Sequence, residues 1–330
     1  MGWIVLDVGT TNMRCRYIQD GHILVKAVRN IGVRNTAMSG SKEPLKEAPR
    51  DCIRECMVKG SVSFKQLEGI AASGMISSNL GLWEVPHVET PAGLKELASG
   101  CQKSLFPEIA PLPIWFVPGV KNSTATEEMN ISRIDFMRGE EVEAMGALKL
   151  TGQKGPLVFV SPGSHMKYVL IDEQNRIVQS LTTMGGELLW AISRGTILAD
   201  SIPETLVEEM EEDYLRQGME ACRSFGFTRA CFMVRSLHLF TESQENARAN
   251  FLNGILLEQD IRALEAGMAG SRDIPFLIGG RKLLRQMFRK ALILKGYPEG
   301  RVIELDDDIV EASSSVGVMA VLEERSRMEG

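Results

Sequence analysis

The feature that most constrains the fold is a short motif that occurs twice. Residues 158–171 (VFVSPGSHMKYVLI) align without gaps on residues 4–17 (IVLDVGTTNMRCRY). The turn residues correspond one to one: Asp7 with Ser161, Gly9 with Gly163, and Thr10 with Ser164. In each copy two apolar runs flank a glycine–hydroxyl turn, and a third apolar run follows a polar turn. The repetition predicts two similar halves, each built on a three-stranded meander.

The rest of the chain indicates an α/β fold. Apolar residues recur at helical spacing over residues 43–60, 139–152, 245–267 and 281–296. Short buried-strand patterns such as LEGIAASGM and IPFLIGG alternate with these helices. At 330 residues and 44% hydrophobic composition, the chain can bury two domain-sized cores. The frequent prolines from Pro86 to Pro118 predict an irregular surface segment.

Composition excludes several classes of protein. A net charge of −6 disfavours sequence-independent binding of nucleic acid, which depends on lysine and arginine. No stretch of about 18 apolar residues could span a bilayer, so we expect no membrane association and a cytoplasmic location. The six cysteines form no CxxC pair, so neither a zinc site nor a disulfide framework is indicated. A symmetric homodimer is the base-rate expectation for the oligomeric state.

The two turns have the chemistry of phosphate-binding loops. Backbone N–H groups and hydroxyls at Gly9, Thr10 and Thr11 could donate to phosphate oxygens, as could those at Gly163 and Ser164. His165 and Lys167 follow the second glycine and supply cations for the phosphates.

Asp7 would repel phosphate unless a metal ion intervened. Mg²⁺ is usually held by one or two carboxylates together with phosphate oxygens, so Asp7 is a candidate magnesium residue. The alternative is that Asp7 stabilises the turn by an Asx-type hydrogen bond.

Two further segments are candidates for the site. Gly279 and Gly280 end a buried strand before a helix, which suits the α-phosphate or adenine side of a nucleotide, although paired glycines are also common connectors. Glu140 and Glu141 begin a helix beside Arg138, where a carboxylate could accept a proton from a substrate hydroxyl. The alternative for this segment is helix capping and a surface ion pair.

The motifs together resemble a known family. LDVGTTNMR, GMISSNLGLWEVP, FMRGEE, SPGSHMKYV and FLIGG, in that order, resemble the 2-dehydro-3-deoxygalactonokinases of the sugar-kinase/Hsp70/actin-like ATPase superfamily. The resemblance extends from residue 4 to about residue 280. It implies two domains of ribonuclease-H-like, actin-like topology, residues 1–139 and 140–330, with mixed five-stranded sheets and a nucleotide cleft between them. The last helix is expected to return to the first domain.

The implied reaction is transfer of the ATP γ-phosphate to the terminal hydroxyl of 2-dehydro-3-deoxy-D-galactonate, with Mg²⁺ as cofactor. By this resemblance Asp7 serves magnesium, Glu140 is the favoured base, and Asp135 and Glu141 are the other catalytic candidates. The resemblance assigns ATP to both turns and to the paired glycines: Gly9, Thr10, Thr11, Gly163, Ser164, His165, Lys167, Gly279 and Gly280. Candidates for the sugar-acid pocket are Asn12, Arg14, Ser73, Asn79, Trp83 and Arg138.

Two departures from the family pattern concern the second half. The family reads closer to PGTHSKW and TGEL where this chain has PGSHMKY and GGEL, so Met166 and Gly185 replace polar residues. Two alternatives stay open: a kinase of another sugar or sugar acid on the same fold, and a non-catalytic nucleotide-binding regulator.

Overall fold

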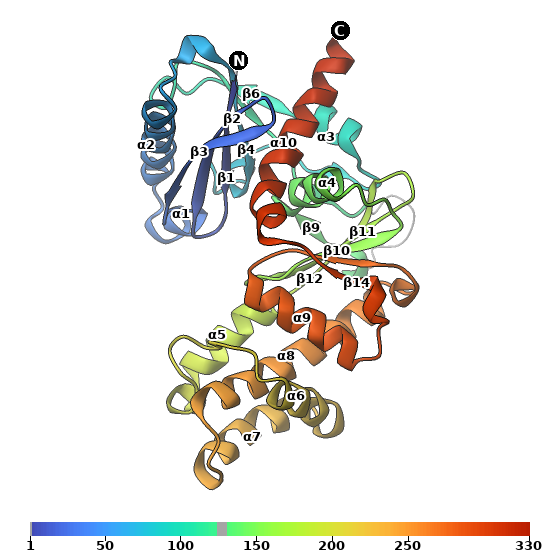
Figure 1. Cartoon of the computed structure of the whole chain (residues 1–330). Coiled ribbons are helices and arrows are strands. Elements are labelled where there is room, and N and C mark those ends of the chain that lie inside the picture. Colours follow the sequence, from blue (N-terminus) through green and yellow to red (C-terminus); the bar gives the residue numbers. More distant parts are fainter. Residues whose placement is uncertain (1, 124–130) are drawn as a thin grey trace. The chain divides into compact units, whose positions relative to one another are not determined.

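The computed structural model describes residues 2–123 and 131–330. Contacts divide the chain into two compact units (Figure 1). Unit 1 contains the described residues of 1–155 together with residues 171–180 and 306–330. Unit 2 contains residues 156–170 and 181–305.

Unit 1 is built on a mixed sheet with the strand order β3-β2-β1-β4-β7-β6. The strands are β1 (Gly2–Val8), β2 (Met13–Gln19), β3 (His22–Arg29), β4 (Leu67–Gly74), β6 (Gln102–Ser104) and β7 (Ile114–Phe116). The first three strands form the predicted antiparallel meander, and β4 lies parallel to β1. The sheet has six strands where five were expected, because β6 adds an antiparallel edge to β7.

Local chemistry explains the meander and its packing. Asp20 and Gly21 both have positive φ, 51° and 78°, which matches the two-residue turn that fits the twist of a hairpin. Helix α1 (Val33–Ser39) and helix α2 (Glu43–Gly60) follow. Leu45 and Ile53 of α2 are fully buried in the same apolar cluster as the inner side chains of β1 and β4. The predicted 43–60 helix is confirmed.

The proline-rich segment is more ordered than predicted. It contains β5 (Val88–Glu89), helix α3 (Leu94–Gly100), β6 and β7. β7 is buried and pairs with β4, so the prediction of an irregular surface segment was wrong for this strand. Its three residues, Ile-Trp-Phe, are too few for a clear alternation pattern between the flanking prolines.

Two glycines bring the ends of unit 1 together. Helix α4 (Glu140–Thr151) packs against helix α10 (Asp307–Glu329), and both belong to unit 1. A Cβ on Gly146 would overlap the Ser313 carbonyl, and one on Gly317 would overlap the Val142 carbonyl. The last helix therefore packs in unit 1, against α4 and also against α3. A small sheet in the order β5-β8-β9 is completed by β8 (Val120–Lys121) and β9 (Phe136–Met137).

Unit 2 contains most of a five-stranded sheet with the order β12-β11-β10-β13-β14. The strands are β10 (Leu157–Ser161), β11 (Met166–Ile171), β12 (Ile177–Thr183), β13 (Phe276–Ile278) and β14 (Val302–Glu304). Tyr168 and Phe276 of this sheet are buried in one apolar cluster with Phe288 of helix α9 (Lys282–Leu294) and Ile261 of helix α8 (Glu245–Gly267). The predicted helices over 245–267 and 281–296 are confirmed.

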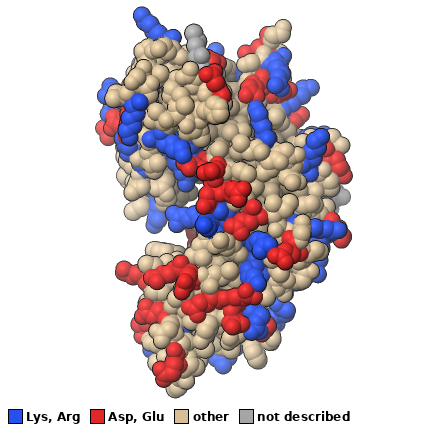
Figure 2. Space-filling view, viewed as in Figure 1, with Lys and Arg blue, Asp and Glu red and all other residues tan. Residues whose placement is uncertain are grey.

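A second apolar cluster in unit 2 lies among helices alone. It joins α8 to helix α5 (Gly185–Gly195), helix α6 (Glu212–Phe225) and helix α7 (Phe227–Phe240). In the view of Figure 2, acidic side chains predominate over the helical part of unit 2, and no continuous basic band crosses the visible face.

The compact units differ from the expected division at residue 139. α4 and residues 306–330 lie in unit 1, where α10 packs against both α4 and α3. Compact units and duplicated halves are different divisions, so the boundary between the halves stays a prediction. Among the described residues, no helix is long and apolar enough to cross a membrane.

Candidate active site

The first glycine–hydroxyl turn joins β1 to β2. The N–H of Gly9 donates to the Asn12 carbonyl at 2.8 Å, which closes the turn. Thr10 and Thr11 are exposed, and the amide of Asn12 donates to the Thr11 hydroxyl at 3.1 Å. The turn thus places Thr10 and Thr11 at the surface, where a phosphate loop needs its hydroxyl and N–H donors.

A glycine that sequence analysis missed supports this turn. The N–H groups of Val33 and Arg34, at the start of α1, donate to the carbonyls of Gly9 and Thr10 at 3.3 and 2.9 Å. Gly32 precedes them, and a Cβ there would overlap both carbonyl groups. The turn is therefore held from behind by a helix start that only glycine allows to approach.

The second turn is held in the same way. The N–H of Glu187, in the first turn of α5, donates to the Ser164 carbonyl at 2.9 Å. A Cβ on Gly186 would overlap the Gly163 carbonyl. Gly186 follows Gly32 at the same sequence offset that separates Gly163 from Gly9. The duplication thus includes the supporting glycine as well as the turn.

A further pair of glycines extends the correspondence. Gly74 ends β4 with φ 81°, and a Cβ there would lie 2.5 Å from the Val8 carbonyl oxygen. Gly280 follows β13 with φ 79°, and a Cβ there would lie 2.7 Å from the Pro162 carbonyl oxygen. Gly280, a predicted site residue, therefore lies against the backbone just before the second turn, as Gly74 lies against the backbone just before the first. Gly279 donates its N–H to the Val160 carbonyl at 2.8 Å.

Asp7 lies among positive groups at the end of β1. Its Oδ2 is 3.3 Å from Nη1 of Arg14 and 3.9 Å from Nη1 of Arg16, and it accepts a hydrogen bond from the Ser314 hydroxyl at 3.2 Å. Arg16 is buried and also donates to the Ser314 hydroxyl and to the Glu311 carbonyl. Residues of α10 thus orient the candidate magnesium residue.

The donor set around Asp7 fits a magnesium ion that is bound mostly by water and phosphate. All of these contacts use Oδ2, so Oδ1 of Asp7 has no protein partner among the described residues. No group of three or more His, Cys, Asp or Glu side chains in the described ranges could form a complete metal cage. A single carboxylate oxygen is compatible with Mg²⁺, which keeps several waters and takes phosphate oxygens.

The two glutamates at the start of α4 have different environments. Glu141 is fully buried, and both of its carboxylate oxygens accept from the Gly139 N–H, at 2.9 and 2.7 Å. Burial, and then the charge of Glu140, raise the pKa of Glu141 to about 8. Glu140 is half-exposed and accepts from the Arg138 N–H at 3.2 Å. Of the two, only Glu140 can reach a substrate.

Asp135 lies at the other end of β9 from Glu140. Its carboxylate accepts from the Ser180 hydroxyl at 3.3 Å, and its carbonyl accepts from the Asn122 N–H at 2.9 Å. These contacts join Asp135 to β12 and to the residue that follows β8.

Arg138 makes mainly structural contacts. Its guanidinium donates to the Ser77 carbonyl and hydroxyl at 2.6 and 2.8 Å and to the Val85 carbonyl at 2.8 Å. Burial lowers the pKa of Arg138, and the charge of Glu141 opposes that shift. The arginine therefore fixes the segment from Ser77 to Val85, and its role as a substrate residue stays a prediction.

The other predicted substrate residues lie on the same segment or on the strands beside it. Ser73 pairs in register with Asp7, and its buried hydroxyl has no hydrogen-bond partner among the described residues. Asn79 is exposed. Trp83 is 40% exposed and donates to the Gln102 side chain at 3.0 Å.

The cations of the second turn differ in accessibility. His165 is half-exposed, with its Nε2 3.7 Å from a carboxylate oxygen of Glu187. Lys167 is buried and donates to the Thr182 hydroxyl. Of these two cations, His165 is the more accessible to a ligand in this conformation.

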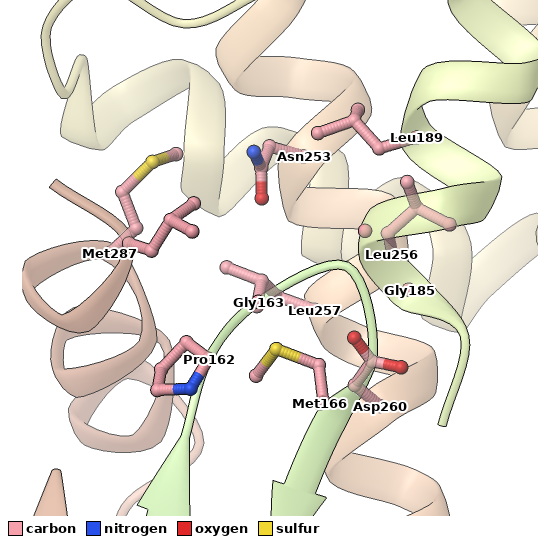
Figure 3. A pocket seen from close by; sticks show the side chains of 12 residues that line it. Pro162, Gly163, Met166, Gly185, Leu189, Asn253, Leu256, Leu257, Asp260 and Met287 are labelled. Carbon is pink, nitrogen blue, oxygen red and sulfur yellow. The ribbon is translucent and has the colours of Figure 1, made fainter. Parts of the chain in front are cut away.

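A small pocket lies behind the second turn (Figure 3). Its volume is about 30 Å³, room for about two waters. Asn253 and Asp260 of α8 point into it beside Pro162 and Gly163, while Gly279 and Gly280 are not among its lining residues. Burial raises the pKa of Asp260 to about 6. A Cβ on Gly185 would overlap the Asp260 carboxylate, which explains why this chain has glycine at that position.

Five residues that shape the site were not predicted from the sequence. Gly32 and Gly186 could have been found, because they repeat at the offset of the two turns. Arg16 and Ser314 gave no signal, because they are 298 residues apart in the chain. Asp260 also gave none, because it lies within a helix without any motif.

Comparisons with solved structures define the class of the fold. The activator of the 2-hydroxyisocaproyl-CoA dehydratase from Clostridium difficile, solved with bound ADPNP, superposes with a TM-score of 0.52. It is 11% identical and the match covers 100% of this chain and 97% of that one. Component A of the Acidaminococcus fermentans (R)-2-hydroxyglutaryl-CoA dehydratase gives a TM-score of 0.51 at 12% identity, with both chains fully covered. The protein therefore has the actin-like ATPase fold that was expected.

Sequence comparison then identifies the family. The chain belongs to the 2-keto-3-deoxy-galactonokinase family, whose profile matches residues 7–312, and it is therefore a sugar-acid kinase that uses ATP. A Rhizobium meliloti (strain 1021) protein named "Probable 2-dehydro-3-deoxygalactonokinase" is 28% identical over 323 residues, 97% of each chain. A candidate 2-dehydro-3-deoxygalactonokinase from Sinorhizobium meliloti, known as a crystal structure, gives a TM-score of 0.75 at 23% identity, covering 99% of this chain and 96% of that one.

Proposed function

We propose that the protein transfers the γ-phosphate of ATP to the terminal hydroxyl of 2-dehydro-3-deoxy-D-galactonate, giving the 6-phosphate and ADP. The observation that carries the proposal is the family match over residues 7–312. That range contains every candidate site residue, from Asp7 to Gly280. ATP as the phosphoryl donor is consistent with a cytoplasmic location.

Each turn is proposed to bind phosphate groups of ATP. In the first turn the donors are backbone N–H groups and the hydroxyls of Thr10 and Thr11. In the second they are the Gly163–Ser164 backbone, the Ser164 hydroxyl and His165, with Lys167 after a side-chain movement. Because the two helix starts hold these turns in place, the turns lose little conformational entropy when phosphate binds.

Asp7 is proposed to hold Mg²⁺ through Oδ1 and water. When bound, the ion would neutralise charge on the transferred phosphate. Arg16 and Ser314 keep the carboxylate in place, and the ion pair with Arg14 also helps to orient it.

Glu140 is proposed to accept the proton of the sugar-acid hydroxyl, with Asp135 as the alternative. Among the described residues, the half-exposed carboxylate of Glu140 at the start of α4 accepts one hydrogen bond, from the Arg138 N–H. The residues proposed to contact the sugar acid are Asn12, Arg14, Ser73, Asn79, Trp83 and Arg138. Ser73 is fully buried and its hydroxyl has no hydrogen-bond partner among the described residues, so its contact with the sugar acid requires a local movement that opens the site.

The test is sugar-acid-dependent release of ADP by the purified protein with ATP and Mg²⁺. We expect release with 2-dehydro-3-deoxy-D-galactonate and much less with its gluconate epimer. Glu140→Gln should lower turnover by about 10²- to 10⁴-fold. Glu143→Gln, in the first turn of the same helix, is the matched control and should stay near the wild-type rate. If ATP binds but no sugar acid stimulates ADP release, the proposal fails.

A further inference from the structure

A large pocket in unit 1 lies far from the proposed catalytic residues. Its volume is about 600 Å³, within the usual range for small-molecule sites. The first turn of α3, the last turn of α4, the loop after α4 and the turn from Gln174 to Arg176 line it. All of these segments belong to unit 1.

Helix α4 separates this pocket from Glu140. Glu140 begins the helix, whereas Leu148, Lys149 and Gly152 line the pocket at its other end. At 1.5 Å per residue the two ends are roughly 15 Å apart. A ligand in the pocket would therefore be bound independently of the residues proposed for phosphoryl transfer.

The lining is strongly basic. It contains the cations Lys95, Lys149, Lys154 and Arg176, and one carboxylate, Glu96. Glu96 accepts a hydrogen bond from the Gly93 N–H at 2.8 Å, so it is committed to the start of α3.

Two of the four cations are available for a ligand. Lys149 pairs with Glu323 at 2.7 Å, and Arg176 makes two hydrogen bonds to Asp172, at 2.9 and 2.8 Å. Lys95 and Lys154 are exposed and form no ion pair with any residue in the described ranges. Two uncompensated ammonium groups on opposite segments of one cavity would attract a ligand with two separated negative groups.

The polar side chains between the lysines indicate what else the ligand carries. Gln153 and Gln174 line the pocket and offer amide donors and acceptors, which suit hydroxyl groups. The apolar part is limited to Leu94, Met145 and Leu148. We propose that this pocket binds a small hydroxylated polyanion of the phosphorylated sugar-acid class, at a site separate from the proposed active site.

This proposal does not depend on the proposed function, because binding can be measured without turnover. The probe is 6-phosphogluconate, titrated calorimetrically into the full-length protein with Mg²⁺ and saturating ADP, so that nucleotide-binding groups are already filled. Gluconate and inorganic phosphate are titrated in the same way. We expect 6-phosphogluconate to bind more tightly than either, and the affinity to fall as salt is raised.

Variants locate the binding. Lys95→Gln and Lys154→Gln should each weaken binding of 6-phosphogluconate about tenfold, since each removes a charge-assisted hydrogen bond. Lys95→Arg should retain most of the affinity. Lys65→Gln, an exposed lysine of the same unit outside the pocket, is the control and should have no effect.

Three results would overturn the proposal. The first is an unchanged affinity in the double variant Lys95→Gln/Lys154→Gln. The second is loss of binding when ADP saturates the protein, since the anion would then occupy the nucleotide site. The third is equal affinity for inorganic phosphate and 6-phosphogluconate, which would remove the sugar-acid part of the assignment.

Discussion

Replacement of Glu141 tests whether a buried carboxyl group at the start of α4 keeps its proton at neutral pH. Burial raises the pKa of Glu141 from 4.5 to about 8. In the unfolded chain the group loses its proton near its ordinary pKa, whereas the folded protein retains it. Stability from this group is therefore fully present below pH 4.5 and is lost as the pH rises through about 8.

The size of the effect follows from the shift. At about 1.4 kcal/mol per pKa unit, the free energy of unfolding should fall by roughly 2 to 3 kcal/mol between pH 5.5 and 7.5 through Glu141 alone. Glu141→Gln is neutral at every pH and still offers one oxygen to the Gly139 N–H. The stability of the variant relative to wild type should therefore increase by that amount over the same range.

The assay is urea unfolding followed by tryptophan fluorescence in a Trp190→Phe background. Trp190 lies in unit 2, and the other three tryptophans, Trp3, Trp83 and Trp115, lie in unit 1. Fluorescence in this background reports unit 1 only. Glu47→Gln, at an exposed glutamate of α2, is the control and should run parallel to wild type. If the difference between Glu141→Gln and wild type stays constant from pH 5.5 to 8.5, the reasoning is refuted.

Three further variants test contacts of the site. Asp260→Asn should stabilise the protein relative to wild type by about 2 to 3 kcal/mol at pH 8 but not near pH 4. Burial raises the pKa of Asp260 from 3.8 to about 6, so the wild-type protein loses the stability from this group as the pH rises through about 6. Calorimetric unfolding at several pH values measures the difference, and a difference that does not change with pH would contradict the prediction. Arg138→Lys should lower the free energy of unfolding by about 2 kcal/mol, because a single ammonium group cannot keep the hydrogen bonds to both Ser77 and Val85. If the stability is unchanged and the KM for the sugar acid rises, Arg138 would instead be assigned to substrate binding. Ser314→Ala should raise the Mg²⁺ concentration for half-maximal activity about fivefold, because it removes the hydrogen bond to Asp7. The control is Ser315→Ala, at a hydroxyl without a hydrogen-bond partner among the described residues. Equal effects of the two substitutions would contradict a specific role for Ser314.

The parts of the fold that sequence analysis predicted correctly rest on local chemistry. The Asp20–Gly21 turn, the 43–60 helix and both glycine–hydroxyl turns are specified by residues next to one another in the chain. The resemblance that named the family rests on the same short motifs, and the comparisons confirm it.

What could not be predicted depends on contacts between distant residues. The burial of Glu141 distinguishes it from Glu140. This burial depends on how the start of α4 packs, so the RGEE motif alone does not predict it. The partners of Asp7 come from β2 and from α10, at the other end of the chain. The bonds from Arg138 to the Ser77 and Val85 carbonyls could not be predicted either, because these partners lie more than 50 residues away in the chain.

The membership of α10 in unit 1 has a consequence for synthesis of the protein. Asp7 and Arg16 emerge from the ribosome early, but the helix that holds them ends at Glu329. The nascent first unit therefore stays incomplete, with the α10-binding face of α4 uncovered, until α10 has been synthesised. The chain of unit 2 is complete earlier, at Leu305, so unit 2 can fold while unit 1 is still unfinished. A ribosome that stalls before α10 would release a product in which unit 2 is assembled but Asp7 and Arg16 lack their hydrogen bonds to Ser314.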